Sequence, residues 1–146
     1  MKMLVSVMLV AAAWGGYHML SQRQAAHALR DVLASADVNG FLDVPPPANQ
    51  DADTIYVIAA QNCPHAAAQQ ADQLAKQLGA QGMPVQRGNQ VHFNPQHIDG
   101  AAMSRLSVVM NGPLPLVFVH GRVASNPELN QVVEEYYRPG TTWTAR

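Results

Sequence analysis

The stretch 54–66 constrains the fold more than any other part of the chain. Thr54–Ala60 is an apolar, β-branched run without clear alternation, which is typical of a strand buried on both faces. The single cysteine, Cys63, follows, and Pro64 comes next. Proline is tolerated at the first position of a helix because the N–H that it lacks has no partner there. The stretch therefore predicts a strand, a cysteine-containing loop and a helix, in that order.

The segment after Cys63 has the period of an amphipathic helix. From Pro64 to Leu78, small and apolar residues recur at steps of three and four, which indicates one buried stripe. The stripe consists of Ala67, Ala71, Leu74 and Leu78. A thiol beside a helix N-terminus lies where the peptide dipoles favour negative charge, and this lowers the pKa of a cysteine. We therefore expect a lowered pKa for Cys63, with His65 nearby as a modulator.

The rest of the folded region is predicted to contain further strands and helices. Periodicity and turn residues indicate strands at 83–87 and 90–93, a helix at 94–110, a hairpin of strands 116–119 and 122–124, and a helix from about 126 to 136. The first two strands should be parallel and joined by a right-handed crossover. The hairpin should add antiparallel strands to the same sheet.

The N-terminus reads as a membrane or export segment. Met3–Leu20 is apolar after Lys2 and would span about 27 Å as a helix, close to the thickness of a bilayer core. Trp14 and Tyr17 suit a membrane interface. Two interpretations stay open: an uncleaved anchor, which we favour, and a secretory leader cut near Ala11–Ala13, where the residues are small.

These features predict four regions. Residues 1–20 form the anchor or signal sequence, and residues 21–50 form a membrane-proximal helix and a linker. Pro45–Pro47 makes that linker a stiff, extended spacer. Residues 51–139 form the folded domain, and residues 140–146 form a flexible tail.

Composition excludes several classes of function. The formal net charge is -1, so no basic surface argues for nucleic acid. One cysteine rules out an intrachain disulfide framework and a cysteine-rich zinc site. His92 and His97 are five residues apart with Asn94-Pro95 between them, which is not the spacing of a metal site on one helix face. We therefore expect no metal.

Two segments resemble the glutaredoxin branch of the thioredoxin-fold superfamily. Asn62–Ala66 is similar to the Cys-Pro-X-Cys site of glutaredoxins and to the Cys-Pro-His-Cys site of periplasmic disulfide oxidoreductases. Leu114–Arg122 resembles the Val-Pro-X-Val-Phe-Val-Asn-Gly-Lys segment of glutaredoxins. The resemblance implies an α/β, thioredoxin-like fold with a mixed four-stranded sheet flanked by helices. It also implies that Pro115 is a cis proline beside Cys63 and that it docks the substrate backbone.

The chain departs from that family at two places. Ala66 stands where the second cysteine of the Cys-Pro-X-Cys site would be, so a dithiol cycle within the chain is impossible. Ser125-Asn126 replaces the glycine-rich turn that helps to hold glutathione, so we expect no cofactor and leave glutathione as an open alternative. The Cys-Gly-Phe-Ser site of the glutaredoxins that bind iron–sulfur clusters is absent, and that activity is not carried over.

Two functions follow as expectations. The first is a membrane-tethered, envelope-facing protein that performs monothiol thiol–disulfide exchange, with Cys63 as nucleophile, His65 as modulator and Pro115 as docking residue. The second is a redox-inactive binding subunit of an envelope assembly, such as a secretion or conjugation apparatus. The partner is a protein or a protein disulfide in the envelope. The expected location is a bacterial-type inner membrane with the domain in the periplasm, or the periplasm itself if the leader is cleaved.

Overall fold

The structure, a computed structural model, describes residues 39–48, 50–60 and 65–139, together with Val32, Ala34, Ala36 and Asp37. The chain divides into two compact units, 1–34 and 35–146, and every element named below belongs to the second. The predicted anchor or signal segment, Cys63 and the predicted tail 140–146 lie outside the described residues. Of the helices that the structure describes, none is long and apolar enough to cross a bilayer.

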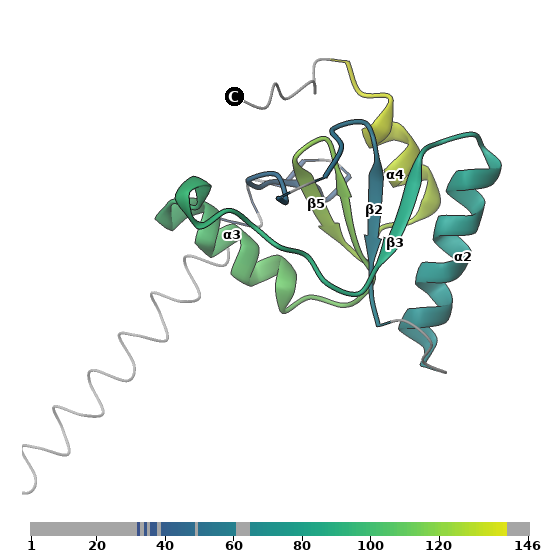
Figure 1. The fold of residues 1–146 in the computed structure, drawn as a ribbon, viewed down its shortest axis with the longest axis horizontal. Coiled ribbons are helices and arrows are strands. Elements are labelled where there is room, and N and C mark those ends of the chain that lie inside the picture. The colour runs from purple at the N-terminus through teal and green to yellow at the C-terminus, as the bar shows by residue number, and fades with distance from the viewer. Residues whose placement is uncertain are drawn as a thin grey trace, which may run out of the picture. The chain divides into compact units, whose positions relative to one another are not determined.

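Within the described residues, the chain forms a mixed α/β fold with one sheet and three α-helices (Figure 1). The strands are β1 (Leu42–Asp43), β2 (Ile55–Ile58), β3 (Val85–Gly88), β4 (Leu116–Val119) and β5 (Arg122–Ser125). The helices are α2 (Ala66–Ala80), α3 (Gly100–Met110) and α4 (Leu129–Tyr136), with a short 3-10 helix, η1 (Pro95–His97), before α3.

The sheet has five strands in the order β1-β5-β4-β2-β3, where four were predicted. β2 and β3 are parallel and are joined through α2, as expected for a strand–helix–strand unit. β4 runs antiparallel to β2, and β5 runs antiparallel to both β4 and β1. This mixed arrangement is compatible with a thioredoxin-like fold.

The fifth strand comes from the segment that the sequence assigns to a linker. Leu42 pairs with Val123 of β5, and the side chain of Phe41 is fully buried in the core. Pro47 forms a further bridge with Phe93. The folded region therefore begins before the boundary predicted at residue 50. A two-residue strand is too short to show the period of two by which strands are recognised in a sequence.

The core is built from alternate residues of the strands. Ile55, Val57 and Ala59 pack with Val117 and Val119 in one cluster. The cluster also holds Ala71, Leu74 and Leu78 of α2 and Val132 of α4. Because successive strand residues point to opposite faces, Tyr56, Ile58 and Phe118 lie on the other face, where Phe93 contacts Phe118. Both faces of β2 and β4 are therefore buried, as the unbroken apolar runs predict.

The helices cover the sheet from two sides. α2 and α4 contact each other, and α2 also packs on β3 and β2, whereas α3 packs on β5 and β1. Figure 1 shows α2 and α4 to the right of the sheet and α3 to its left. The buried stripe of α2 contains Ala71, Leu74 and Leu78 as predicted, with Ala68 rather than Ala67 at its start.

Two local predictions need correction, and a third is confirmed. The predicted strand 90–93 is a loop that forms only the isolated bridge at Phe93. The predicted helix 94–110 is two helices, because the side chain of Asn94 caps η1 and that of Asp99 caps α3. The hairpin turn is confirmed, and its residues His120 and Gly121 have φ values of 49° and 74°. Two positive φ values are the conformation of a tight two-residue hairpin turn.

Candidate functional site

The candidate site lies where β2 ends and α2 begins. Ala59 is buried after the last residue of β2, Ala60 is exposed, and residues 61–64, including Cys63, lie outside the described residues. The chain is described again from His65, which is the N-cap of α2. The backbone carbonyl of His65 accepts hydrogen bonds from the N–H groups of Ala68 and Gln69. The helix therefore begins at Ala66 rather than at the proline predicted as its first residue.

Pro115 lies beside this junction. Ile58, the last residue of β2, pairs with Leu116, the first residue of β4. Pro115 directly precedes Leu116, and its side chain is less than 2% exposed. The Leu114–Pro115 peptide bond is cis, as the resemblance implies. The pairing thus brings Pro115 to the end of β2, the strand that precedes Cys63 in the sequence.

The hydrogen bonds of Asn126 to Gln70 and to Pro115 link α2, the end of β5 and the start of β4 at the same end of the sheet. Asn126 follows β5, and its backbone N–H donates to the carbonyl of Pro115 at 2.7 Å. Its side-chain Oδ1 accepts a hydrogen bond of 2.7 Å from Nε2 of Gln70 on α2. Asn126 has a φ of 51°, which asparagine tolerates better than most residues. In the sequence, Ser125-Asn126 is recognisable only as the place where a glycine-rich turn is missing. No nearby residue predicts the contact of Asn126 with Gln70.

Arg87 is a second residue of the junction that the sequence does not reveal. It stands in β3 next to Val57, and its guanidinium reaches the carboxyl end of β2. Nη1 donates to the carbonyls of Ala59 at 2.9 Å and Gly88 at 2.6 Å, and Nη2 donates to that of Ala60 at 3.1 Å. An arginine near the end of a strand is too common to signal such a role.

The site residues predicted from the sequence are therefore placed as follows. His65 is exposed at the start of α2, Pro115 is buried at the start of β4, and Cys63 falls in the interval that the structure does not describe. Among the described residues, no group of three or more His, Cys, Asp or Glu side chains is placed to hold a metal ion. The described part of the site therefore consists of the end of β2, the start of α2 and the backbone polar groups of both.

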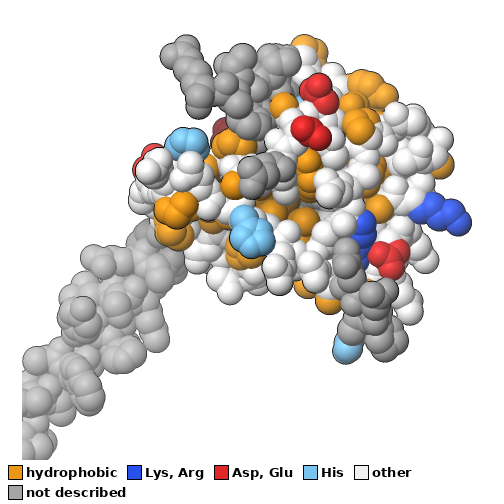
Figure 2. Space-filling view, viewed as in Figure 1, with side chains coloured by type: hydrophobic (Ala, Val, Ile, Leu, Met, Phe, Trp, Pro, Cys, Tyr) orange, Lys and Arg blue, Asp and Glu red, His pale blue; other side chains and the backbone are white. Residues whose placement is uncertain are grey.

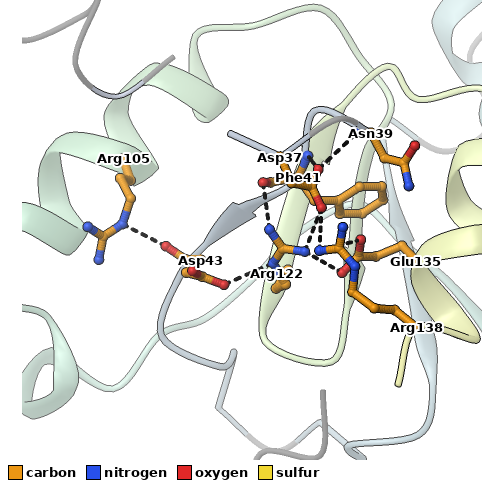
Figure 3. A network of polar contacts seen from close by, with 8 residues as sticks. All are labelled: Asp37, Asn39, Phe41, Asp43, Arg105, Arg122, Glu135 and Arg138. Atoms are coloured by element: carbon orange, nitrogen blue, oxygen red, sulfur yellow. Dashed lines mark hydrogen bonds and ion pairs between the residues drawn. The ribbon is translucent and has the colours of Figure 1, made fainter. Parts of the chain in front are cut away.

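A separate network of charged side chains surrounds Arg122 in β5 (Figure 3). Nη1 of Arg122 donates to Oδ2 of Asp37 at 2.8 Å and to Oε1 of Glu135 at 2.6 Å. Nε bonds to Oδ1 of Asp43 at 2.9 Å, and Nη2 donates to the carbonyl of Phe41 at 3.0 Å. The network ties the segment before β1 to β5 and α4.

Arg138 extends this network from the residues after α4. Its Nη1 pairs with Oδ2 of Asp37 and lies 3.5 Å from Oε2 of Glu135. Two arginines thus share two buried or nearly buried carboxylates, because the side chains of Glu135 and Asp37 are 0% and 13% exposed. Figure 3 shows Arg122 between Asp43 on one side and Glu135 with Arg138 on the other.

Burial and charge act differently on the members of the network. Burial alone would raise the pKa of Asp37, but hydrogen bonds from Arg122 and from the Phe41 N–H lower it to about 2. Burial raises the pKa of Glu135 above its usual range, although Arg122 and Arg138 oppose the rise. Burial would lower the pKa of Arg122, but the carboxylates of Asp37 and Glu135 raise it. The network therefore holds charged groups whose pKa values are shifted in opposite directions, that of Asp37 downward and that of Glu135 upward.

Several large apolar side chains are exposed close to the candidate site and on α3. Met103 and Met110 of α3 are 55% and 52% exposed, and Leu114, next to Pro115, is 40% exposed. Met103 and Met110 are seven residues apart and so share one helix face. Figure 2 shows hydrophobic side chains at several places on the face that it presents, and few charged ones.

Comparison with models of known protein families, with curated proteins and with solved structures gave no match.

Proposed function

We propose that this chain is a membrane-tethered, envelope-facing protein of the thioredoxin-like, glutaredoxin-like type, in which Cys63 performs monothiol thiol–disulfide exchange. The observation that supports the proposal is the pairing of Ile58 with Leu116. It brings Pro115 to the end of β2, the strand that Cys63 follows in the sequence, and the two sequence motifs predict that Pro115 lies beside Cys63. The strand–helix–strand unit followed by an antiparallel hairpin agrees with the same fold.

The reaction needs one thiolate from the chain. The Cys63 thiolate attacks one sulfur of a protein disulfide, a new S–S bond forms between them, and the substrate's own S–S bond breaks. The released sulfur leaves as a thiolate and takes a proton from water. A second thiol, either a neighbouring cysteine of the substrate or a small external thiol, then attacks the mixed disulfide and restores Cys63.

The positions of α2 and Ala66 favour a reactive Cys63 thiol without a resolving partner. α2 begins at Ala66, and Cys63 precedes the N-cap, His65, by two residues in the sequence. The dipole at a helix N-terminus favours an anion. Ala66 occupies the first helical position and supplies no second sulfur. A mixed disulfide formed at Cys63 therefore persists until another thiol arrives.

A redox-inactive binding subunit of an envelope assembly is the second candidate. The observation that favours it is the exposure of Met103, Met110 and Leu114, since large apolar side chains on a surface often mark a contact with another protein. In this case the sheet and α3 present a docking surface, and Cys63 is dispensable.

Trapping of mixed disulfides separates the two candidates. The full-length chain is expressed in cells, thiols are quenched with acid and alkylated, and adducts are separated without reductant. Exchange through Cys63 predicts adducts that reductant removes and that Cys63→Ser abolishes. Equal partner capture by the wild type and by Cys63→Ser, with capture lost in Leu114→Asp, supports the binding subunit instead.

A further inference from the structure

A groove lies between the C-terminal end of α2 and α4. It is open to solvent, has a volume of about 330 Å³ and is lined by Gln81, Leu129, Asn130, Val133 and Glu134. α2 and α4 contact each other, and Figure 1 shows them as neighbours. Pockets that hold small ligands begin at about 300 Å³, so the groove has room for one long side chain.

The groove has an apolar floor and a polar rim. Leu129 and Val133 are four residues apart on α4, so they lie on one face of the helix, and both are half-buried against the main core cluster. Gln81 and Asn130 are exposed and carry amide oxygens, and Glu134 is exposed and carries a carboxylate. The rim therefore offers hydrogen-bond acceptors beside an apolar surface.

Two features of the groove favour a cation. The first is the carboxylate of Glu134. The second is the end of α2, which stops at Ala80 with Gln81 as its C-cap and has no basic residue in its last turn. The peptide dipoles leave partial negative charge at a helix C-terminus, which attracts a cation. None of the five described residues that line the groove is basic.

We propose that this groove docks an arginine side chain of a protein partner. The aliphatic stem of an arginine can pack on Leu129 and Val133 while its charged head stays at the rim. The guanidinium has five N–H donors in a planar fork, so it can donate to the Glu134 carboxylate and to an amide oxygen at once. Lysine offers one compact ammonium and matches this rim less well.

An open groove suits an anchor side chain of a larger partner better than a free small molecule. Sites for small ligands bury about 70–90% of the ligand surface, which a groove open to solvent does not do. In a protein interface, the contacts around an arginine anchor exclude water from it. The groove lies at the opposite end of the 15-residue helix α2 from the candidate site, so the inference does not depend on Cys63.

Titration of the full-length chain in a non-ionic detergent with a short arginine peptide tests the proposal. The probe is acetyl-Gly-Arg-Gly-amide, and the matched control is the same peptide with citrulline, which has nearly the same shape and no charge. Chemical shifts of the backbone amides, measured by NMR, locate the binding. The arginine peptide is expected to shift the amides of Gln81 and of residues 129–134, and the citrulline peptide should bind at least about threefold more weakly.

Three variants of the chain separate the charge from the shape of the groove. Glu134→Gln keeps the shape and removes the charge, so binding should weaken by about threefold, the effect of one exposed ion pair. Asp53→Asn removes the same charge from the exposed turn before β2, outside the groove, and should change nothing. Asn130→Phe places a large side chain in the groove from an exposed position and should abolish binding.

Several results would overturn the proposal. These are equal binding of the two peptides, equal effects of Glu134→Gln and Asp53→Asn, and shifts that are absent or centred outside the groove. Tighter binding of the free polyamine spermidine at the same amides would assign the groove to a small molecule and overturn the protein partner. All of these measurements can be repeated in Cys63→Ser, so a failure of the proposed function leaves their outcome unchanged.

Discussion

Nη1 of Arg122 lies 2.6 Å from Oε1 of Glu135, and the Glu135 side chain is fully buried. The contact joins β5 to α4, and the same guanidinium bonds Asp37 and the carbonyl of Phe41. The segment before β1 is therefore fastened to the C-terminal half of the fold. Removing one member of a buried ion cluster leaves the others without a partner, which costs more than the cluster itself contributes.

Replacement of Arg122 by alanine should therefore lower the free energy of unfolding by about 3–5 kcal/mol. The measurement is equilibrium unfolding in urea. Arg105→Ala is the matched control, because it removes the same charge and a single hydrogen bond to the carbonyl of Asp43. That change should cost about 1 kcal/mol. Equal losses in the two variants would show that the cluster does not hold the segment before β1.

Asp37→Asn should lower stability at neutral pH and do so less and less in acid. The pKa of Asp37 is lowered to about 2, so its ionised form stabilises the fold above the pKa of the unfolded chain. The stabilisation is about 2 kcal/mol near pH 7 and is lost as the pH falls from about 4 through 2. Urea unfolding at a series of pH values measures the difference between wild type and variant.

Glu135 acts with the opposite sign and serves as the control for this titration. Because burial raises the pKa of Glu135, its contribution is fully present below its unfolded pKa and is lost as the pH rises through its folded pKa. The wild type should therefore gain stability on mild acidification, as Glu135 takes up a proton, and Glu135→Gln should lack this gain. Both proteins should still lose stability at lower pH, where Asp37 becomes protonated. If the free energies of unfolding of the wild type and of Asp37→Asn differ by the same amount from about pH 7 to about pH 2, the lowered pKa of Asp37 is not the source of the pH dependence.

Phe41→Ala tests whether the segment before residue 50 belongs to the core. The side chain of Phe41 is 0% exposed and packs with Val57 and Val119 in the main cluster. Truncating a fully buried phenylalanine costs about 3–5 kcal/mol. Met103→Ala on α3, where the side chain is 55% exposed, should change stability by about 0.5 kcal/mol or less. A similarly small effect for Phe41→Ala would show that the segment before residue 50 is a linker and not part of the core.

Gly112→Ala should destabilise the turn between α3 and β4. A Cβ atom at Gly112 would lie 2.9 Å from Cβ of Ser125 and would also contact its Oγ, which donates to the carbonyl of Pro113. The overlap should cost about 1–3 kcal/mol. In Gly79→Ala the new Cβ meets no atom within 4 Å, and the helix α2 should gain about 0.5–1 kcal/mol. Thermal unfolding temperatures of the two variants should therefore shift in opposite directions, and shifts of the same sign would contradict the close approach of Gly112 to Ser125.

The sequence predicts the local elements of this fold better than its long-range contacts. The strand 54–60, the helix after Cys63 and the hairpin around His120 each have a periodicity or a turn residue within a few positions. β1 has no such signal, because two residues between polar and proline-rich stretches show no period. It becomes a strand only because β5 offers an edge to pair with.

The candidate site was predictable in part for the same reason. The pairing of Leu116, which follows Pro115, with the end of β2 follows from the order of strands, which two local motifs suggested. Arg87 and Gln70 act through groups that lie 27 and 56 residues away in the chain, such as the carbonyl of Ala60 and Oδ1 of Asn126. Contacts of this kind are set by tertiary packing, so no window of sequence contains them.

The most direct test of the central claim is the rate at which iodoacetamide alkylates Cys63 in the folded, full-length chain at pH 6, relative to free cysteine. A thiol that precedes the N-terminus of α2 in the sequence should react about tenfold faster than free cysteine, because a larger fraction of it is thiolate. Reaction no faster than that of free cysteine, or reaction only after denaturation, would contradict the account.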